Sequence, residues 1–327
     1  MDAGLAIETT DLRKRFGAVE AVAGIDLRVE SGAVFGFLGP NGAGKTTTIR
    51  MLVALLHPNR GTITLFGQPV HPGAEILRSV GALVERPAFY PYLSATSNLR
   101  LFAAARGIGS REAAALIGPA LDRTGLTSVA GRNVGGYSTG MRQRLGLALA
   151  MLHRPRLVIL DEPTNGLDPG GVVEVRAIIG ELAHDGTTVF LSSHVLSEVE
   201  QLCERVAILR HGRVVGAGAT RELIGGEGRL FVRFDTPAES EAARRLLASA
   251  GLAVQPADDE PVLGTLVDTG AAEGSRLARK LGEAGLYPGE LTVRRPTLES
   301  VFLELTRDEA SDAPPGRPLP PARTGPA

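Results

Sequence analysis

A run of nine residues has the composition of a loop that wraps phosphate groups. It consists of Gly39, Pro40, Asn41, Gly42, Ala43, Gly44, Lys45, Thr46 and Thr47, which fits the pattern G-x-x-x-x-G-K-[ST]. Glycines let backbone N–H groups converge on phosphate oxygens without a Cβ in the way. Lys45 places a positive charge at the β and γ phosphates of a nucleotide, and the hydroxyl of Thr46 is suited to ligating Mg²⁺. The run predicts a nucleotide phosphate site, with a chance glycine turn as the alternative.

Two adjacent carboxylates follow a short apolar run later in the chain. Residues 157–160 read LVIL, and Asp161 and Glu162 come directly after them. At a strand end, Asp161 is placed to hold Mg²⁺ directly or through water. Glu162 is then placed to polarise a water that attacks the γ-phosphate. Two acidic residues that merely cap a strand are the alternative, which the phosphate loop upstream disfavours.

Strands buried on both faces are the elements that would position these groups. Short apolar runs occur at residues 34–38, 157–160, 188–191 and 206–209, with helical patterns between them. This alternation is typical of an α/β fold with a mainly parallel sheet. The first run ends at the phosphate loop, and a helix is expected from about Lys45. The N-terminus of that helix would point its partial positive charge at the phosphates.

The composition changes twice along the chain, which predicts its domain organisation. Alanine-rich and leucine-rich helical patterns dominate residues 86–153, so we expect a helical subdomain inserted into a first domain of residues 1–227. Strand-like and helical patterns at residues 228–307 predict a small C-terminal α+β accessory domain. Residues 308–327 contain six prolines and no core-forming apolar run. We expect this tail to be disordered, as a solvated tail rather than a docking peptide.

The charge balance argues against a nucleic-acid binder. The chain has 35 Lys and Arg against 36 Asp and Glu, a net charge of -1, and its basic residues form no stripe. No run of about 18 apolar residues occurs and the N-terminus has none of signal-peptide type, so a cytoplasmic protein is expected. Cys203 is the single cysteine and is expected to be a small core residue.

A third motif narrows the class of nucleotide enzyme. Residues 134–144 read VGGYSTGMRQR and precede the acidic pair. They resemble the signature motif of ATP-binding cassette (ABC) proteins, usually written L-S-G-G-Q, and they retain its serine as Ser138 and its second glycine as Gly140. The segment DEPTNGLDP at residues 161–169 is similar to the core block that follows the signature in this family. The resemblance covers roughly residues 5–225.

Two further residues take their expected roles from this resemblance. His194, after the strand-like run VFLS, resembles the switch histidine of the family, which contacts the γ-phosphate and helps to orient the attacking water. Phe16 resembles the aromatic residue on which adenine stacks. The other histidines, His153 among them, lack metal-ligand spacing and are expected to be solvated or to cap helices.

The family implies a P-loop NTPase core that acts as a dimer, homomeric or heteromeric, with two ATP molecules and their Mg²⁺ at the interface. Each ATP would lie between the phosphate loop of one subunit and the signature of the other. Ser138 would contribute a hydroxyl and Gly140 a backbone N–H at a helix N-terminus. The further partner is an integral membrane permease, which would place this ATPase at the inner face of the cell membrane.

The sequence departs from the family pattern at three positions. Thr139 and Met141 replace the glycine and the glutamine of the signature. Glu85 stands where most members have a glutamine that contacts Mg²⁺ or the attacking water. A carboxylate offers the metal a full charge but lacks the amide donor. Glutamate there is similar to the variant in bacitracin and lantibiotic self-protection transporters, which favours a drug or peptide-antibiotic exporter over a tolerated polar exchange.

Two other interpretations are open at this point. A non-transport ABC ATPase acting on ribosomes or chromosomes is disfavoured, because there is one phosphate loop, one signature and no sustained heptad pattern. A kinase or switch GTPase does not explain the signature.

The aromatic residues Phe89, Tyr90 and Tyr92, close after Glu85, are either a local core patch or a groove for a short cytoplasmic helix of the permease.

Overall fold

The computed structural model describes residues 4–85, 88–225, 228–257, 260–269, 273–295 and 297–307. Among these, residues 4–219 and 302–307 belong to one compact unit and residues 220–301 to another. The sequence composition changes nearby, at residue 228. The start of the expected helical subdomain at residue 86 and the proline-rich tail lie outside the described residues.

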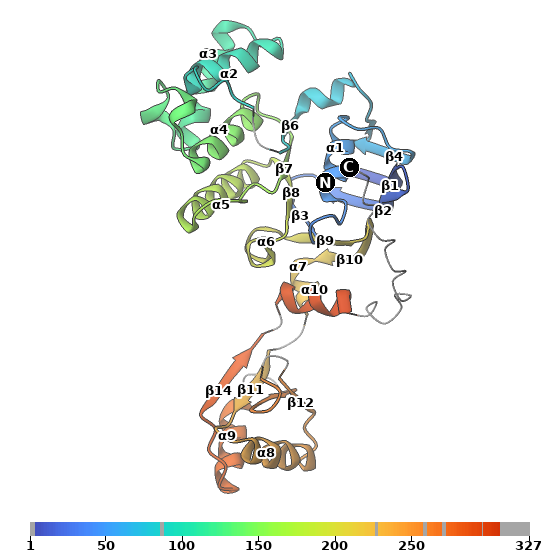
Figure 1. Ribbon diagram of the computed structural model, residues 1–327, viewed down its shortest axis with the longest axis vertical. Coiled ribbons are helices and arrows are strands. Elements are labelled where there is room, and N and C mark those ends of the chain that lie inside the picture. Colours follow the sequence, from blue (N-terminus) through green and yellow to red (C-terminus); the bar gives the residue numbers. More distant parts are fainter. Residues whose placement is uncertain are drawn as a thin grey trace, which may run out of the picture. The chain divides into compact units, whose positions relative to one another are not determined.

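Within the described residues, six strands form the central sheet, in the order β10-β9-β3-β8-β7-β6 (Figure 1). Their bounds are Val34–Leu38 (β3), Val80–Leu83 (β6), Leu157–Asp161 (β7), Thr188–Ser193 (β8), Arg205–Arg210 (β9) and Arg213–Ala219 (β10). All but β10 run parallel. Every residue of β3, β7 and β8 is buried, as in a sheet covered on both faces. Their carboxyl ends, which carry the motifs, therefore meet at one edge.

A second, antiparallel sheet packs against the first through a shared core. Its order is β2-β1-β4-β5, with bounds Leu5–Phe16 (β1), Val19–Glu30 (β2), Arg60–Leu65 (β4) and Gln68–Pro69 (β5). Ile7 and Ile25 of this sheet cluster with Phe37 and Leu209 of the central sheet and with Ile49 on the first helix. Burial of these side chains contributes about 1.5–3 kcal/mol each and fixes that helix between the sheets.

Outside the helical segment between β6 and β7, the described residues next to the central strands in sequence include helices α1 (Lys45–Leu52), α5 (Pro169–His184) and α6 (Leu196–Leu202) and the 3₁₀ segment η1 (Glu75–Ser79). Asp168 caps α5: its carboxylate accepts the N–H of Gly171 at 2.8 Å, and Pro169 occupies the first turn. Cys203 ends α6 and is buried near Gly36 of β3. Burial raises the pKa of its thiol.

Helices α2 (Ala95–Ala105), α3 (Ser110–Arg123) and α4 (Thr139–Met151), with the 3₁₀ turns η2 (Thr127–Val129) and η3 (Val134–Gly136), build a separate helical lobe (Figure 1). Its core includes Leu99, Ile117 and Leu145. Ion pairs connect the lobe to α5: Arg123 with Glu181 and Asp185, and Arg144 with Glu174 at 3.2 Å. The guanidinium of Arg123 lowers the pKa of the Asp185 carboxyl.

Residues 220–301 begin with α7 (Thr220–Ile224) and then follow a βαββαβ order. The elements are β11 (Arg229–Arg233), α8 (Pro237–Ser249), β12 (Val254–Pro256), β13 (Gly264–Val267), α9 (Gly274–Glu283) and β14 (Glu290–Arg294). Helix α10 (Leu298–Arg307) follows, and its residues from 302 onward belong to the first unit. The sheet is antiparallel, in the order β12-β13-β11-β14. Leu230 and Val232 of β11 pack on Leu247 of α8 and Leu281 of α9. This topology is the split βαβ arrangement.

Candidate functional site

The predicted phosphate loop lies between the buried strand β3 and helix α1. Gly44 takes the position before α1 with φ of 106°, a conformation that favours glycine. A Cβ at Gly44 would lie 2.4 Å from the carbonyl oxygen of Ala21 on β2, so a side chain has no room there. Thr46 and Thr47 lie in the first turn of α1 and are partly buried. The loop is thus a backbone cradle at a helix N-terminus, which suits an anion.

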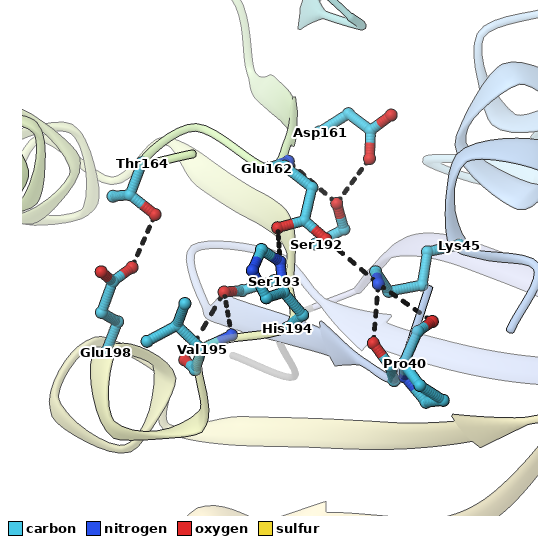
Figure 2. Close-up of polar contacts among 11 residues, drawn as sticks. Pro40, Lys45, Asp161, Glu162, Thr164, Ser192, Ser193, His194, Val195 and Glu198 are labelled. Carbon is cyan, nitrogen blue, oxygen red and sulfur yellow. Dashed lines mark hydrogen bonds and ion pairs between the residues drawn. The ribbon is translucent and has the colours of Figure 1, made fainter. Parts of the chain in front are cut away.

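The side chain of Lys45 folds back across this loop. It is 6% exposed, and its Nζ donates to the carbonyl of Gly39 at 2.7 Å and to that of Pro40 at 3.4 Å. On its other side Nζ lies 3.1 Å from Oε1 of Glu162 (Figure 2). The ammonium therefore lies between the phosphate loop and the acidic end of β7, where it can contact both a phosphate group and the carboxylate.

The acidic pair is held by a serine that sequence reasoning missed. The hydroxyl of Ser192, near the end of β8, donates to Oδ1 of Asp161 at 2.6 Å and accepts the N–H of Glu162 at 3.0 Å (Figure 2). Because β7 and β8 are parallel neighbours, this bond fixes both carboxylates against the sheet edge. The two serines that follow the apolar residues of β8 were the available signal.

His194 joins the same cluster from the residue that follows β8. Its Nδ1 lies 2.7 Å from Oε2 of Glu162, so Glu162 contacts the ammonium with one oxygen and the imidazole with the other (Figure 2). The backbone of Glu162 has φ of 50°, which is uncommon for a residue with a Cβ. The structure thus brings together Lys45, Asp161, Glu162 and His194, an arrangement suited to binding a polyphosphate and activating a water beside it.

The remaining predicted residues make other contacts. Phe16 ends β1 with its ring 49% exposed and the Nζ of Lys14 5.3 Å from the ring centre. Glu85 has φ of 62° and pairs its carboxylate with Arg50 on α1. Its carboxylate thus contacts α1 rather than the Lys45 cluster.

The signature residues form the start of α4. Ser138 is its N-cap, and the hydroxyl accepts the N–H of Met141 at 3.2 Å. Gly140 lies in the first turn, open on the side where a Cβ would meet only Leu167 at 3.8 Å and Ser138 at 4.0 Å. Tyr137 is buried just before them and donates to the carbonyl of Val129 at 2.7 Å, which anchors the turn that leads into the helix.

No helix in the described ranges of the chain combines the length and the apolarity that crossing a membrane requires.

Comparison with known proteins identifies the family. The model of the ABC transporter family matches residues 22–165. The bacitracin transport ATP-binding protein BcrA of Bacillus licheniformis is 47% identical over 211 residues, 64% of this chain and 68% of that protein. The daunorubicin resistance ATP-binding protein DrrA3 of Streptomyces coeruleorubidus is 39% identical over 311 residues, 94% of this chain and 98% of that protein.

A solved structure agrees with these relatives. The ATP-binding subunit of an ABC transporter superposes with a TM-score of 0.61 at 31% identity, over 67% of this chain and 91% of that one. The predicted family and the predicted α/β nucleotide-binding core are confirmed. The chain belongs to the ATP-binding subunits of ABC transporters, and its activity is that of an ATPase.

Proposed function

We propose that this chain drives the export of a drug or peptide antibiotic through a separate membrane permease, by ATP-dependent dimerisation and hydrolysis. The names of the relatives support the substrate class, since they are proteins of bacitracin transport and daunorubicin resistance. The observation that carries the mechanism is the cluster of Lys45, Glu162 and His194 at the carboxyl edge of the central sheet.

ATP binding is assigned to the loop from Gly39 to Thr47 and to Phe16. The backbone N–H groups of the loop and the N-terminus of α1 receive the phosphates, and the exposed ring of Phe16 offers a face for adenine. Lys45 supplies the charge. A γ-phosphate competes with Glu162 for this ammonium, so nucleotide binding loosens the ion pair of 3.1 Å and frees the Glu162 carboxylate.

Hydrolysis is assigned to Glu162 with His194 as its partner. Oε1 of Glu162 takes the proton of a water that attacks the γ-phosphate, and the imidazole of His194 holds the other oxygen at 2.7 Å and faces the same phosphate. General base action of this kind contributes about 10²–10⁴-fold to a rate.

Mg²⁺ fits the donors that the site offers. Among the described residues no group of three or more His, Cys, Asp or Glu side chains could hold a metal ion. Mg²⁺ does not need such a group, because it is usually held by one or two protein oxygens together with phosphates and water. Asp161 and Thr46 would hold it, and Glu85 would join them after leaving Arg50. When bound, the ion neutralises charge that develops on the phosphate oxygens.

The dimer completes the site. The Ser138 hydroxyl accepts from its own helix and keeps its O–H for an outside acceptor, and the first turn of α4 adds the N–H of Gly140. Both groups suit the γ-phosphate of an ATP bound by a second subunit, identical or related. ATP would then hold the two subunits together until hydrolysis releases them.

The permease is assigned to the exposed tyrosines of the helical lobe. Tyr90 and Tyr92 are 43% and 68% exposed and pack edge to face, whereas Phe89 packs on Phe102 inside the lobe. Asn98 orders the segment: its side chain accepts the N–H of Tyr90 and donates to the carbonyl of Tyr90. Such a surface suits a short cytoplasmic helix, which would hold this ATPase at the inner face of the cell membrane.

The test uses Glu162→Gln, which keeps the shape of the side chain and removes the base. We expect it to bind ATP, to lose about 10²–10⁴-fold in turnover, and to accumulate as an ATP-bound dimer. Tagged Glu162→Gln protein with ATP and Mg²⁺ should recover a polytopic, strongly apolar partner from detergent-solubilised host membranes. The control is Glu162→Gln with Lys45→Ala, which should recover none. Wild-type turnover would refute the base assignment, and recovery of ribosomal or chromosomal proteins would refute the transport assignment.

A further inference from the structure

The phosphate loop contacts two other backbone segments. They are strand β2 at Ala21–Ala23 and the two-residue turn of His211 and Gly212 between β9 and β10. The N–H of Gly212 donates to the carbonyl of Ala43 in the loop at 3.0 Å, and the carbonyl of Gly212 accepts the N–H of Ala23 at 2.8 Å. Gly212 is therefore bonded to the phosphate loop on one side and to β2 on the other.

The contact between the loop and β2 is equally close. A Cβ on Gly44 would lie 2.4 Å from the carbonyl oxygen of Ala21, and a Cβ on Gly212 would lie 2.8 Å from the same oxygen. Ala21 is thus enclosed by the backbones of two glycines. At these distances a side chain on either glycine forces one of the three segments to move, because the obstructing atoms are backbone.

Strand β2 leads from this contact directly to Phe16. Val19 pairs with Phe16 across the β1–β2 hairpin, and Ala21 is two residues further along the strand. Two residues of strand span about 7 Å, so the phosphate loop and the base-stacking ring are linked through one short, hydrogen-bonded piece of β2. A shift of Ala21 displaces Phe16 relative to the loop.

We infer that the His211–Gly212 turn is a spacer, a positioning element that sets the distance between the base-stacking ring of Phe16 and the phosphate loop. This inference rests on the proposed role of Phe16. A nucleotide binds both subsites only when their separation matches the length of its base, ribose and phosphate chain. The affinity for a ligand that consists of phosphates alone does not depend on that separation.

The chain provides a matched control for the turn. The backbone of His211 and Gly212 has φ of 47° and 74°, and that of Phe66 and Gly67, between β4 and β5, has φ of 48° and 75°. Both pairs have the two positive φ angles of a type I′ hairpin turn. A Cβ on Gly67 would meet nothing within 4 Å. Gly67→Ala therefore reproduces the backbone strain of Gly212→Ala without the collision.

The experiment compares ADP with inorganic pyrophosphate, each with Mg²⁺, by calorimetric titration of the full chain. ADP is not consumed, and pyrophosphate carries its two phosphates without the base. For Gly212→Ala we expect the Kd for ADP to rise about tenfold, which is within the contribution of one base stack, and that for pyrophosphate to rise less than about threefold. For Gly67→Ala both constants should remain within about twofold of wild type.

Two outcomes would overturn the spacer. Equal weakening of ADP and pyrophosphate in Gly212→Ala would make the turn a mere support of the phosphate loop, and no change in either would remove its role. If Gly212→Ala fails to fold, His211→Gly, which loosens the turn without a Cβ, should give the same selectivity with a smaller change. Phe16→Ala tests the base platform separately: unchanged ADP binding there refutes the role of Phe16, whatever the turn does.

Discussion

The edge of the central sheet and the start of α4 differ in charge and in burial. At the sheet edge, Lys45, Asp161 and Glu162 are buried or nearly so, and each charge has a partner within the same chain. At the start of α4, Ser138 and Gly140 are uncharged and lie at a helix N-terminus, where Ser138 is exposed and Gly140 is partly exposed. Among the described residues, the charges of the first region find partners within one chain, whereas the hydroxyl of Ser138 only accepts, from the N–H of Met141. This difference fits the proposed site, in which one chain supplies the catalytic groups and a second chain supplies the signature residues.

The largest expected effect tests whether the two regions act together across a dimer. Lys45→Ala and Ser138→Ala should each lower turnover by about 10²-fold or more, since each removes a proposed donor to the γ-phosphate. In a mixture, every mixed dimer combines the intact Lys45 of one subunit with the intact Ser138 of the other. Steady-state ATPase activity of the mixture should therefore exceed the average of the two variants.

Ser94→Ala is the control for the lost helix cap. Ser94 caps α2 in the same lobe and accepts the N–H of Ser97 at 3.1 Å, so both substitutions cost about 0.5–2 kcal/mol of stability. Ser94→Ala should retain wild-type turnover. A mixture no more active than the average of its components would contradict the shared site.

A smaller effect concerns the outer surface of the lobe. Tyr90→Glu and Tyr92→Glu place a charge on the exposed pair while leaving the sheet edge untouched, because both residues are exposed and neither belongs to the lobe core. Basal ATPase activity of the isolated chain should stay within about twofold of wild type, whereas transport with the permease should fall by tenfold or more, about 1.4 kcal/mol of docking energy. Substrate efflux from vesicles measures the second quantity. Unchanged efflux would remove the tyrosines from the docking surface.

The smallest effect concerns the joint between the lobe and the sheet. His153 follows α4, and its Nε2 lies 3.2 Å from Arg106, which also donates to the carbonyl of Val80 at 3.2 Å. Burial and the charge of Arg106 lower the pKa of His153 to about 4. Below pH 6.5 His153 is protonated in the unfolded chain but stays neutral in the folded chain until about pH 4. The stability of the folded state therefore declines from pH 6.5 to about pH 4, and His153 causes no further decline below that.

Thermal unfolding at pH 7 and pH 5 measures this loss. Allowing for solvent screening of a half-exposed ring, His153 should account for about 1 kcal/mol at pH 5. His153→Gln, which stays neutral, should lose that much less between the two pH values. An identical pH dependence in wild type and variant would refute the assignment, and the ion pair of Arg123 with Asp185 would then be the next group to test.

The strands that carry the site were predictable because burial on both faces leaves a continuous apolar run. Residues 34–38 coincide with β3, and the runs at 157–160 and 188–191 extend by one and two polar residues into β7 and β8. Strand β12 was not predicted: with three residues, the last a proline, it has no periodic signal. The expectation that His153 is solvated or a cap was wrong, since the ring is half-buried against Arg106.

Within the candidate site, the motifs predicted which residues take part but not which atoms they contact. Lys45 and Glu162 stand 117 positions apart in the chain, and their ion pair is a product of the parallel order of β3, β8 and β7. Ser192 and Gly212 carry no motif of their own, because their roles consist of bonds to segments that are distant in sequence. Such roles follow from the fold and only then from residue type.

The burial of Cys203 makes this chain suitable for site-specific labelling with spectroscopic reporters. The single thiol is 5% exposed, and its raised pKa keeps it protonated at neutral pH, so it reacts slowly with maleimides and methanethiosulfonates. A cysteine introduced on an exposed face, for example in place of Val173 on α5, would be labelled selectively in the otherwise natural sequence. Spin or dye pairs placed in this way could follow the approach of two subunits in real time without prior removal of the buried Cys203.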